Sequence, residues 1–262
     1  MQTDIFIPAR LDSKRLPSKH LKEINNIPII MHLVNRLKNC QSIKNIIVCT
    51  TTSPSDDILV QYLKQENIQF FRGSEFDILQ RFLNAANEFN TDIIIDVEAD
   101  KIYTDPKYVE QISHEMNNSD IDFMTGNNSL DTLDPEFVFH GFIPAGIKVK
   151  ALKRICELKK TNNTETGYKE FFTSNNFIKT KFLIPQTNLS IKKNFRFTID
   201  YPEDFELAKI IFSNLGTHFD TEQLLKYIEK NSALQEIINP IIKKWKENYE
   251  QNIIEFRLNQ SD

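Results

Sequence analysis

Cysteine is scarce in this sequence and is not spaced for bonding. The 262 residues hold three cysteines, Cys40, Cys49 and Cys156. They are odd in number and far apart, with no CxxC or Cys/His ligand spacing, so neither a disulfide framework nor a zinc site is predicted. This cysteine usage favours a reducing compartment, and we expect a cytoplasmic protein.

Long apolar runs and an excess of positive charge are also lacking. No run approaches the roughly 20 residues of a membrane-spanning helix, and the N-terminal MQTDIFIPAR has no signal-peptide pattern. The formal net charge is -4, and Lys and Arg are spread along the chain without a basic tail or stripe. We therefore expect a soluble protein with neither a nucleic-acid nor a membrane partner. Its 40% hydrophobic content is enough for a large core in a single α/β domain.

Short apolar runs alternate with helical patterns in the first part of the chain. Runs typical of buried strands cover residues 4–8, 43–50, 68–71 and 91–97. Helical patterns follow them at residues 28–40, 55–65, 77–89 and 105–117, with Ser55 and Ser74 as expected N-caps of the second and third. Strand followed by helix, repeated, predicts a parallel sheet with right-handed crossovers.

The rhythm changes from about residue 119. Strand-like runs cover residues 137–149, 179–185 and 194–200. Helical patterns cover residues 151–160, 202–212 and 220–230, and residues 232–257 form a helical tail interrupted at Pro240. No internal repeat or linker is visible.

A basic loop follows the first apolar run. The sequence IPARLDSKRLPSKHL carries four cations, Arg10, Lys14, Arg15 and Lys19. Ligands of open α/β sheets bind outside the carboxyl ends of the strands, where Arg and Lys neutralise phosphate oxygens. The loop thus favours a triphosphate ligand, although a solvated basic surface loop has the same composition.

The same loop resembles the signature of the cytidylyltransferases that activate sugar acids and related surface-polysaccharide precursors. That family includes the enzymes that make CMP-Kdo and CMP-sialic acid, and the spore-coat-polysaccharide branch is the most similar to this sequence. Its pattern is PAR, two or three residues, then SxRLPxKxL, and Ser18 stands where the family usually has Gly. The resemblance implies that Arg15 and Lys19 stabilise charge on the reacting phosphorus and the departing pyrophosphate. It also implies nucleotide contacts from Pro8, Ala9, Arg10 and Ser13.

Two further segments resemble the metal-binding motifs of this family. DVEADKIYTDP resembles xxxGDxPLxDP and places the metal-binding carboxylate at Asp100, while Ala99, Ile102 and Tyr103 replace Gly, Pro and Leu. FTIDYPEDFE resembles TVDxPEDLE and implies a second ligand at Asp200, at the end of a strand. Taken alone, DYPED is also a typical helix start. Magnesium needs only one or two carboxylates beside phosphate oxygens and water, so the resemblance implies a Mg²⁺ cofactor.

The nucleoside and acceptor contacts rest on weaker similarity. IIVCTTTSPSDD and FRGSEFDILQRF resemble family segments near the nucleotide base and the nucleoside, which implies contacts from Thr50, Thr51, Arg72, Ser74 and Asp77. Glu75 and Asp77 also suit an ordinary acidic helix start. The family's acceptor segment has no clear counterpart, and our acceptor candidates are Lys148, Tyr168 and Lys169.

The resemblance also implies a fold and a reaction. The fold is an α/β, Rossmann-like three-layer αβα sandwich of the glycosyltransferase-A type, with a mixed, mostly parallel sheet, in a homodimer. We divide the single domain into a nucleotide-binding half (1–118), an acceptor and dimerisation half (119–215) and a helical tail (216–262). The reaction is CTP-dependent transfer of a nucleoside monophosphate to a small anionic acceptor with pyrophosphate release. The acceptor is a sugar acid, a sugar phosphate or a related phosphonate, and the product serves surface glycan, capsule or lipopolysaccharide synthesis.

Two other functions stay open. Glu98-Ala99-Asp100 resembles the DxD metal motif of nucleotide-sugar-dependent glycosyltransferases, although those enzymes have less use for a cationic first loop. The altered residues after Asp100 are also consistent with a nucleotide-binding protein that has lost catalysis. Retention of Arg15 and Lys19 beside the two carboxylates argues against that second alternative.

Overall fold

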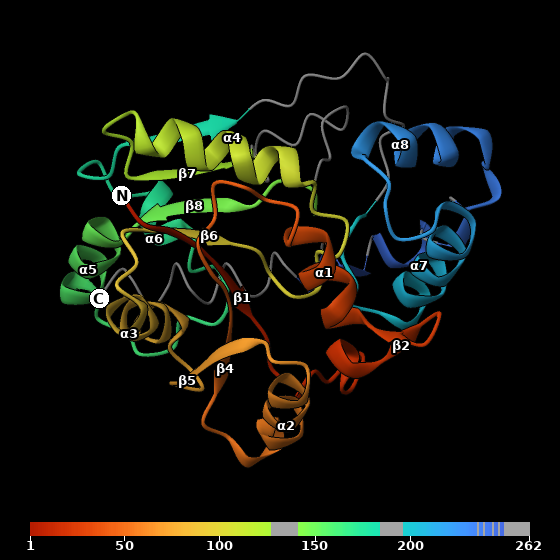
Figure 1. Cartoon of the computed structure of the whole chain (residues 1–262), viewed down its shortest axis with the longest axis horizontal. Coiled ribbons are helices and arrows are strands. Elements are labelled where there is room, and N and C mark those ends of the chain that lie inside the picture. The colour runs from red at the N-terminus through yellow and green to blue at the C-terminus, as the bar shows by residue number, and fades with distance from the viewer. Residues whose placement is uncertain are drawn as a thin grey trace.

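A seven-stranded sheet forms the centre of the molecule (Figure 1). The computed structural model describes residues 1–126, 141–183 and 196–248, except 235, 238, 243 and 246. The strand order is β5-β4-β1-β6-β8-β7-β9. Within this sheet β8 runs antiparallel to both of its neighbours, and the other pairs are parallel. The strands are β1 (Thr3–Pro8), β4 (Ile46–Thr51), β5 (Gln69–Gly73), β6 (Ile93–Asp96), β7 (Phe123–Gly126), β8 (Ala145–Lys148) and β9 (Thr180–Leu183).

Helices cover both faces of the sheet, because successive strand residues point to opposite sides. In β1, Ile5 and Ile7 belong to one hydrophobic core and Phe6 to the other. The first core packs against α1 (Ile29–Leu37), α2 (Asp57–Gln65), α4 (Pro106–Asn117), α7 (Pro202–Leu215) and α8 (Thr221–Lys230). The second packs against α3 (Ile78–Phe89), α5 (Val149–Leu158) and α6 (Glu170–Thr173). The predicted three-layer αβα sandwich with a mixed, mostly parallel sheet is therefore confirmed.

Two predicted helix caps are wrong. The N-cap of α2 is Asp56, the last residue of the 3-10 turn η2 (Pro54–Asp56), and the Ser55 hydroxyl pairs instead with Ser53. The N-cap of α3 is Asp77, whose carboxylate accepts from the Gln80 backbone N–H at 3.1 Å. Ser74 lies three residues before Asp77, and its hydroxyl accepts from the Asp77 N–H.

The strand predicted at residues 194–200 is also wrong over its described part. Residues 196–200 belong to no strand, because β1 and β8 already occupy both sides of β6. Phe197 and Ile199 are apolar for another reason, since both are buried in the first core. One backbone hydrogen bond, from Ile199 N–H to Asp100 C=O at 3.0 Å, joins this segment to the loop after β6.

A small hairpin escaped prediction. It pairs β2 (Glu23–Ile24) with β3 (Ile27–Pro28) around Asn25 and Asn26, whose φ angles are 51° and 61°. Asn tolerates this left-handed backbone, which two-residue hairpin turns require. The hairpin leads directly into α1. Residues 127–140, 184–195 and 249–262, which include residues 137–140 of the strand predicted at 137–149 and the end of the tail, lie outside the described residues. Within the described part of that prediction the strand is β8.

Candidate active site

One ammonium group joins the two predicted metal carboxylates. The Lys19 Nζ lies 2.8 Å from Asp100 Oδ2 and 3.1 Å from Asp200 Oδ1, and it also donates to the Ile199 carbonyl at 3.0 Å. Lys19 starts the 3-10 turn η1 (Lys19–Leu21), while Asp100 follows β6 and Asp200 precedes α7. The Lys19 side chain is 9% exposed, so this contact is largely shielded from water. The structure thus brings three sequence-predicted residues together beyond the carboxyl ends of β1 and β6.

The loop from β1 to η1 is closed by backbone and side-chain hydrogen bonds. The Ser18 N–H donates to the Leu11 carbonyl at 3.2 Å, and the Leu11 N–H donates to Asp56 Oδ1 at 2.7 Å. The other Asp56 oxygen accepts from the Thr51 hydroxyl. The loop is therefore fixed to the end of β4 as well as to β1, which determines where Lys19 begins its turn.

Ser18 adopts a backbone conformation that suits glycine. Its φ is 53° and its ψ is 30°, a left-handed conformation that costs a residue with a Cβ roughly 1–2 kcal/mol. We expect Ser18→Gly to raise the free energy of unfolding by about 0.5–1 kcal/mol, because relief of this cost exceeds the entropy that Gly adds to the unfolded chain. Urea unfolding measures the change, with Ser55→Gly as a control on an exposed serine. Equal loss of stability in both variants would contradict the strained geometry.

Asp200 is the centre of the cationic contacts. Its Oδ1 accepts from Arg15 Nη2 at 2.9 Å as well as from Lys19, and its Oδ2 accepts from Arg196 Nη2 at 3.0 Å. The Asp204 carboxylate accepts from the backbone N–H groups of Asp200 and Tyr201, each at 3.0 Å, and so fixes the start of α7. Arg196 was missed by sequence reasoning. Its position four residues before Asp200 in RFTID was the available signal.

The pKa values of the two carboxylates shift in opposite directions. Burial raises the pKa of Asp100, with a further rise from neighbouring Asp200, and the single contact from Lys19 does not offset them. Burial acts on Asp200 in the same sense, but Lys19, Arg196 and Arg15 together bring its pKa well below the usual range. Asp100 Oδ1 is also buried without a hydrogen-bond partner, whereas both Asp200 oxygens are engaged. Asp100 is therefore the carboxylate with an oxygen left for a ligand.

A second polar cluster lies beside the first. Lys101 and Lys169 both donate to Glu98 Oε1, at 2.8 and 2.5 Å, and Tyr168 donates its hydroxyl to Asp96. Burial raises the pKa of Asp96, while the two lysines hold the pKa of Glu98 well below its usual value. We call Asp100 and Asp200 the carboxylate cluster. Because Glu98 is two residues before Asp100, the predicted acceptor residues Tyr168 and Lys169 adjoin this cluster. Glu98 and Lys101 extend the candidate acceptor set.

The remaining contacts predicted within the loop are tied to protein groups. Arg10 Nε lies 3.1 Å from Asp12 and 3.7 Å from Glu165, and its side chain is 40% exposed. The Ser13 hydroxyl accepts from the Leu16 N–H at 3.3 Å. The Ala9 N–H donates to the Cys49 carbonyl, and the Pro8 carbonyl accepts from the Ala99 N–H. Pro8 and Ala9 thus align the loop with β4 and with the segment that carries Asp100.

The predicted nucleoside contacts have structural roles in this state. Thr50 and Thr51 are fully buried at the end of β4. Arg72 donates to the Thr51 and Ser53 carbonyls and pairs with Asp57 at 2.7 Å. Asp77 is buried, caps α3 and binds Lys159 at 2.5 Å. Ser74 accepts from the Asp77 N–H. Thr51, Arg72, Ser74 and Asp77 are therefore engaged by protein groups, whereas the buried Thr50 hydroxyl has no hydrogen-bond partner among the described residues.

Lys148 lies at the opposite edge of the sheet from Asp100. It is paired in register with Ile93 at the beginning of β6, whereas Asp100 follows the end of that strand. Its ammonium donates to the Ser119 carbonyl at 2.6 Å. Because β8 runs antiparallel to β6, the end of β8 lies at the opposite edge of the sheet. The acceptor role predicted for Lys148 does not fit this position.

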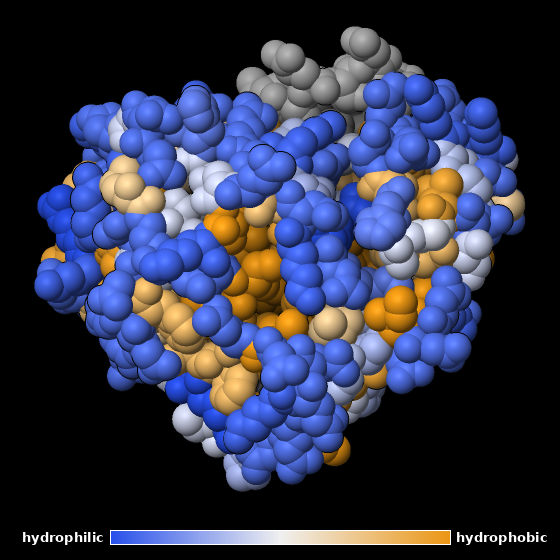
Figure 2. Space-filling view, in the orientation of Figure 1, coloured by the Kyte–Doolittle hydropathy of each residue, from blue (hydrophilic) through white to orange (hydrophobic). Residues whose placement is uncertain are grey.

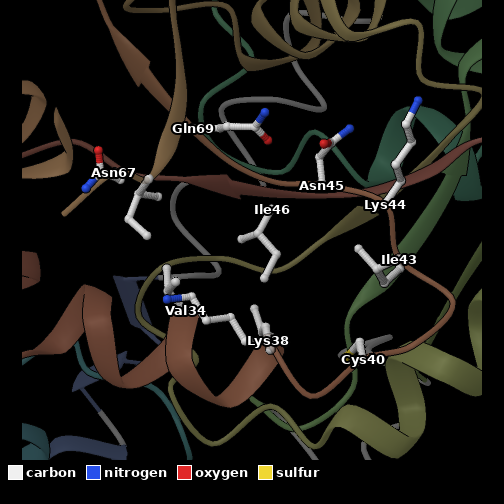
Figure 3. A pocket seen from close by; sticks show the side chains of 11 residues that line it. Val34, Lys38, Cys40, Ile43, Lys44, Asn45, Ile46, Asn67 and Gln69 are labelled. Atoms are coloured by element: carbon white, nitrogen blue, oxygen red, sulfur yellow. The ribbon is translucent and has the colours of Figure 1, made fainter.

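A pocket of about 460 Å³ also lies at the edge opposite the predicted site. It is lined by residues at the end of α1 and before β4 and β5, among them Val34, Lys38, Ile43, Lys44 and Gln69 (Figure 3). The space-filling view shows apolar surface in a hollow near the centre, amid largely hydrophilic surroundings (Figure 2). None of the predicted site residues lines the pocket.

The metal-binding capacity of the described residues is confined to pairs of carboxylates. Within residues 1–126, 141–183 and the described part of 196–248, no three His, Cys, Asp or Glu side chains gather as a metal site. Two carboxylates with one free oxygen still fit a hard cation whose other ligands are phosphate oxygens and water. No helix in these ranges is long and apolar enough to cross a membrane.

Comparison with known proteins identifies relatives along most of the chain. An uncharacterized protein of Methanocaldococcus jannaschii is 29% identical over 245 residues, which cover 91% of this chain and 95% of that protein. The spore coat polysaccharide biosynthesis protein SpsF of Bacillus subtilis is 24% identical over 239 residues, covering 86% and 93%.

Solved structures also resemble this chain over most of its length. A cytidylyltransferase from Leptospira borgpetersenii aligns with a TM-score of 0.77 and 28% identity, over 91% of this chain and 97% of that one. A CMP-2-keto-3-deoxy-manno-octonic acid synthetase complexed with CTP aligns with a TM-score of 0.64 and 15% identity, over 82% and 100%, and supports the fold. The sequence profile described as Cytidylyltransferase matches residues 5–231. The chain therefore belongs to the cytidylyltransferase family of enzymes.

Proposed function

We propose that this enzyme transfers CMP from CTP to a small anionic acceptor and releases pyrophosphate. The observation that carries the proposal is the Lys19 ammonium held between Asp100 and Asp200, with Arg15 on the same Asp200 oxygen. Cations and carboxylates gathered beyond the carboxyl ends of the strands suit a metal-bound triphosphate. The CTP-bound relative of the same fold supports CTP as the donor.

In the proposed reaction the cations of the site exchange their carboxylate partners for phosphate oxygens. An acceptor oxygen attacks the α-phosphorus, the bond from that phosphorus to the oxygen of the pyrophosphate breaks, and the acceptor proton leaves to solvent or to a base. Lys19 and Arg15 move from carboxylate to phosphate oxygens, where they neutralise charge on the α-phosphoryl group and the pyrophosphate. Asp100 and Asp200 would hold Mg²⁺, which supplies Lewis-acid stabilisation at the α-phosphate.

The acceptor is proposed to be an anionic sugar derivative. Lys169 lies beside the carboxylate cluster with its side chain 20% exposed, and Lys101 meets it at Glu98. An acceptor carboxylate or phosphate would draw Lys169 away from Glu98. The printed name of a relative in Hydrogenovibrio crunogenus, 27% identical over 153 residues, is 3-deoxy-manno-octulosonate cytidylyltransferase, a sugar-acid activity. The SpsF relationship supports a role in surface-polysaccharide synthesis.

The glycosyltransferase alternative is weaker in this geometry. It requires Glu98 and Asp100 as a metal-binding pair, and it gives no role to the cations Arg15 and Lys19 that the first loop brings to Asp200. Pyrophosphate release decides between these functions. Each of the four nucleoside triphosphates is incubated with Mg²⁺ and either carboxylated or phosphorylated sugars. We expect acceptor-dependent pyrophosphate from CTP, and its absence with every triphosphate would refute nucleotidyl transfer.

Two lysines of the sequence-predicted acceptor set provide a matched comparison. We expect Lys169→Ala to raise the KM for the acceptor about tenfold, since a charged hydrogen bond contributes about 1.5–3 kcal/mol. Lys148→Ala changes a lysine at the opposite edge of the sheet. It should leave the KM for the acceptor and the KM for CTP near those of the wild type. Steady-state kinetics with acceptor varied at saturating CTP measures both variants. The reverse ranking would place the acceptor elsewhere.

A further inference from the structure

The end of the described chain lies against the cations of the proposed triphosphate site. We call this part the cap segment, made up of the described residues Lys244, Trp245, Glu247 and Asn248. The Asn248 side-chain oxygen accepts from Arg15 Nη1 at 3.1 Å, while the other amino group of Arg15 donates to Asp200 at 2.9 Å. One guanidinium therefore joins the cap segment to the carboxylate that also binds Lys19.

Three cation-π contacts extend the same interface. The Arg196 guanidinium, which is bonded to Asp200, lies 4.9 Å from the centroid of the Trp245 ring. The Lys244 ammonium lies 5.3 Å from the centroid of Tyr201, and the Arg15 guanidinium lies 5.1 Å from that same ring. Contacts of this kind are stronger when they are shielded from water. The cap segment thus contacts both arginines that bind Asp200.

The core anchors the chain that leads to this segment. Leu234 and Ile241 are 6% and 3% exposed and belong to the first hydrophobic core, and Ile237, Ile242 and Trp245 pack partly buried against it. These apolar contacts fix where the cap segment meets the site. The family match ends at residue 231, so the cap segment lies beyond the matched region.

The chemistry of these contacts suits a site for anions. An amide oxygen and an indole face orient guanidinium groups without neutralising them, because neither carries a formal charge. Lys244 adds a further positive charge near Tyr201. The cap segment therefore restricts the directions of Arg15 and Arg196 without adding a negative charge beside them, which lowers the ordering cost of binding.

We propose that the cap segment completes the triphosphate-binding site, with Asn248 and Trp245 as positioning residues for Arg15 and Arg196. This inference rests on the proposed nucleotidyl transfer, because it assigns Arg15 to phosphate binding. The ligand class is the polyphosphate of a nucleoside triphosphate. Trp245 is the one tryptophan of the chain, so its emission reports on this interface without interference from another indole.

The first test is a titration of the full-length protein with CTP and Mg²⁺ while tryptophan emission is recorded. We expect a saturating change in emission whose midpoint agrees with the Kd from calorimetry. Unchanged emission at concentrations that saturate calorimetric binding would overturn the cap assignment. A chain that binds no triphosphate would overturn both the cap assignment and the proposed function. Binding without pyrophosphate release would refute only the latter, since the emission measures binding alone.

The second test uses substitutions in the same part of the chain. We expect Asn248→Ala to raise the KM for CTP about three- to tenfold with a smaller change in kcat, given the value of a hydrogen bond to a charged group and the partial exposure of Arg15. Asn239→Ala is the matched control, because Asn239 is an exposed asparagine of the same tail. Trp245→Phe, which keeps an aromatic face, should retain most of the affinity that Trp245→Ala loses. Equal KM values in all four variants would overturn the positioning role.

Discussion

Lys19→Ala is expected to abolish nucleotidyl transfer and to destabilise the fold at the same time. The ammonium is buried between Asp100 and Asp200, so its removal leaves two buried carboxylates without their shared cation. Loss of one partner from a buried ion pair costs about 3–5 kcal/mol, and loss of a cation that stabilises phosphoryl transfer lowers kcat by about 10³-fold or more. Pyrophosphate release and urea unfolding measure the two effects on the same preparation.

Magnesium should separate these two effects. If Mg²⁺ and the Lys19 ammonium use the same carboxylates, Mg²⁺ will raise the melting temperature of Lys19→Ala more than that of the wild type. Activity will stay low, since the metal does not replace the contacts that Lys19 makes with phosphate. Lys14→Ala is the control, because Lys14 is an exposed cation of the same loop and should keep wild-type stability. An active and equally stable Lys19→Ala protein would remove Lys19 from the site.

The sequence predicted the central elements because their local patterns are strong. The buried runs that became β1, β4, β5 and β6 are short and apolar, and the helices after them begin with recognisable polar or proline residues. The run ending at Asp200 was assigned to a strand because Phe197 and Ile199 alternate with polar residues. That alternation arises instead from packing over a core, and period alone does not distinguish the two cases.

The site contacts between residues far apart in the sequence could be predicted only from the family resemblance. Lys19 is 81 residues from Asp100 and 181 residues from Asp200, distances in sequence over which no local pattern connects side chains. The family motifs supplied these partners. Arg196 lies one residue before the motif at 197–206, and the motif around Asp100 did not predict the contacts among Asp96, Glu98 and Lys101. Lys148 was chosen as an acceptor candidate for its charge, and charge and composition do not indicate at which edge of a sheet a lysine lies. Strand direction decided that point.

Replacement of Asp100 and of Asp200 by Asn is expected to change stability in opposite directions, although each change abolishes turnover. The folded state raises the pKa of Asp100, so it disfavours the ionised carboxylate and loses stability as pH rises from the unfolded value of about 4 through the raised folded value. Asp100→Asn removes this cost at pH 7. The variant should be as stable as the wild type or more stable, with kcat lower by about 10³-fold if Asp100 binds the metal.

Asp200→Asn is the matched comparison. Its folded pKa is depressed, so its ion pairs contribute stability above an unfolded pKa of about 4 and lose it as pH falls toward the folded value. At pH 7 the substitution leaves Lys19, Arg15 and Arg196 without their shared carboxylate, and we expect a loss of about 3 kcal/mol or more. Urea unfolding at pH 7 and pH 3 tests the pair. The gain of Asp100→Asn and the loss of Asp200→Asn should both shrink at pH 3. Asp100 is then largely protonated in both the folded and the unfolded state. Asp200 stays ionised in the folded state while its unfolded carboxyl becomes protonated, which reduces the stability that its ion pairs contribute. Equal losses in the two variants at pH 7 would show that both carboxylates stabilise the fold, and that Asp100 is not the carboxylate held for a ligand.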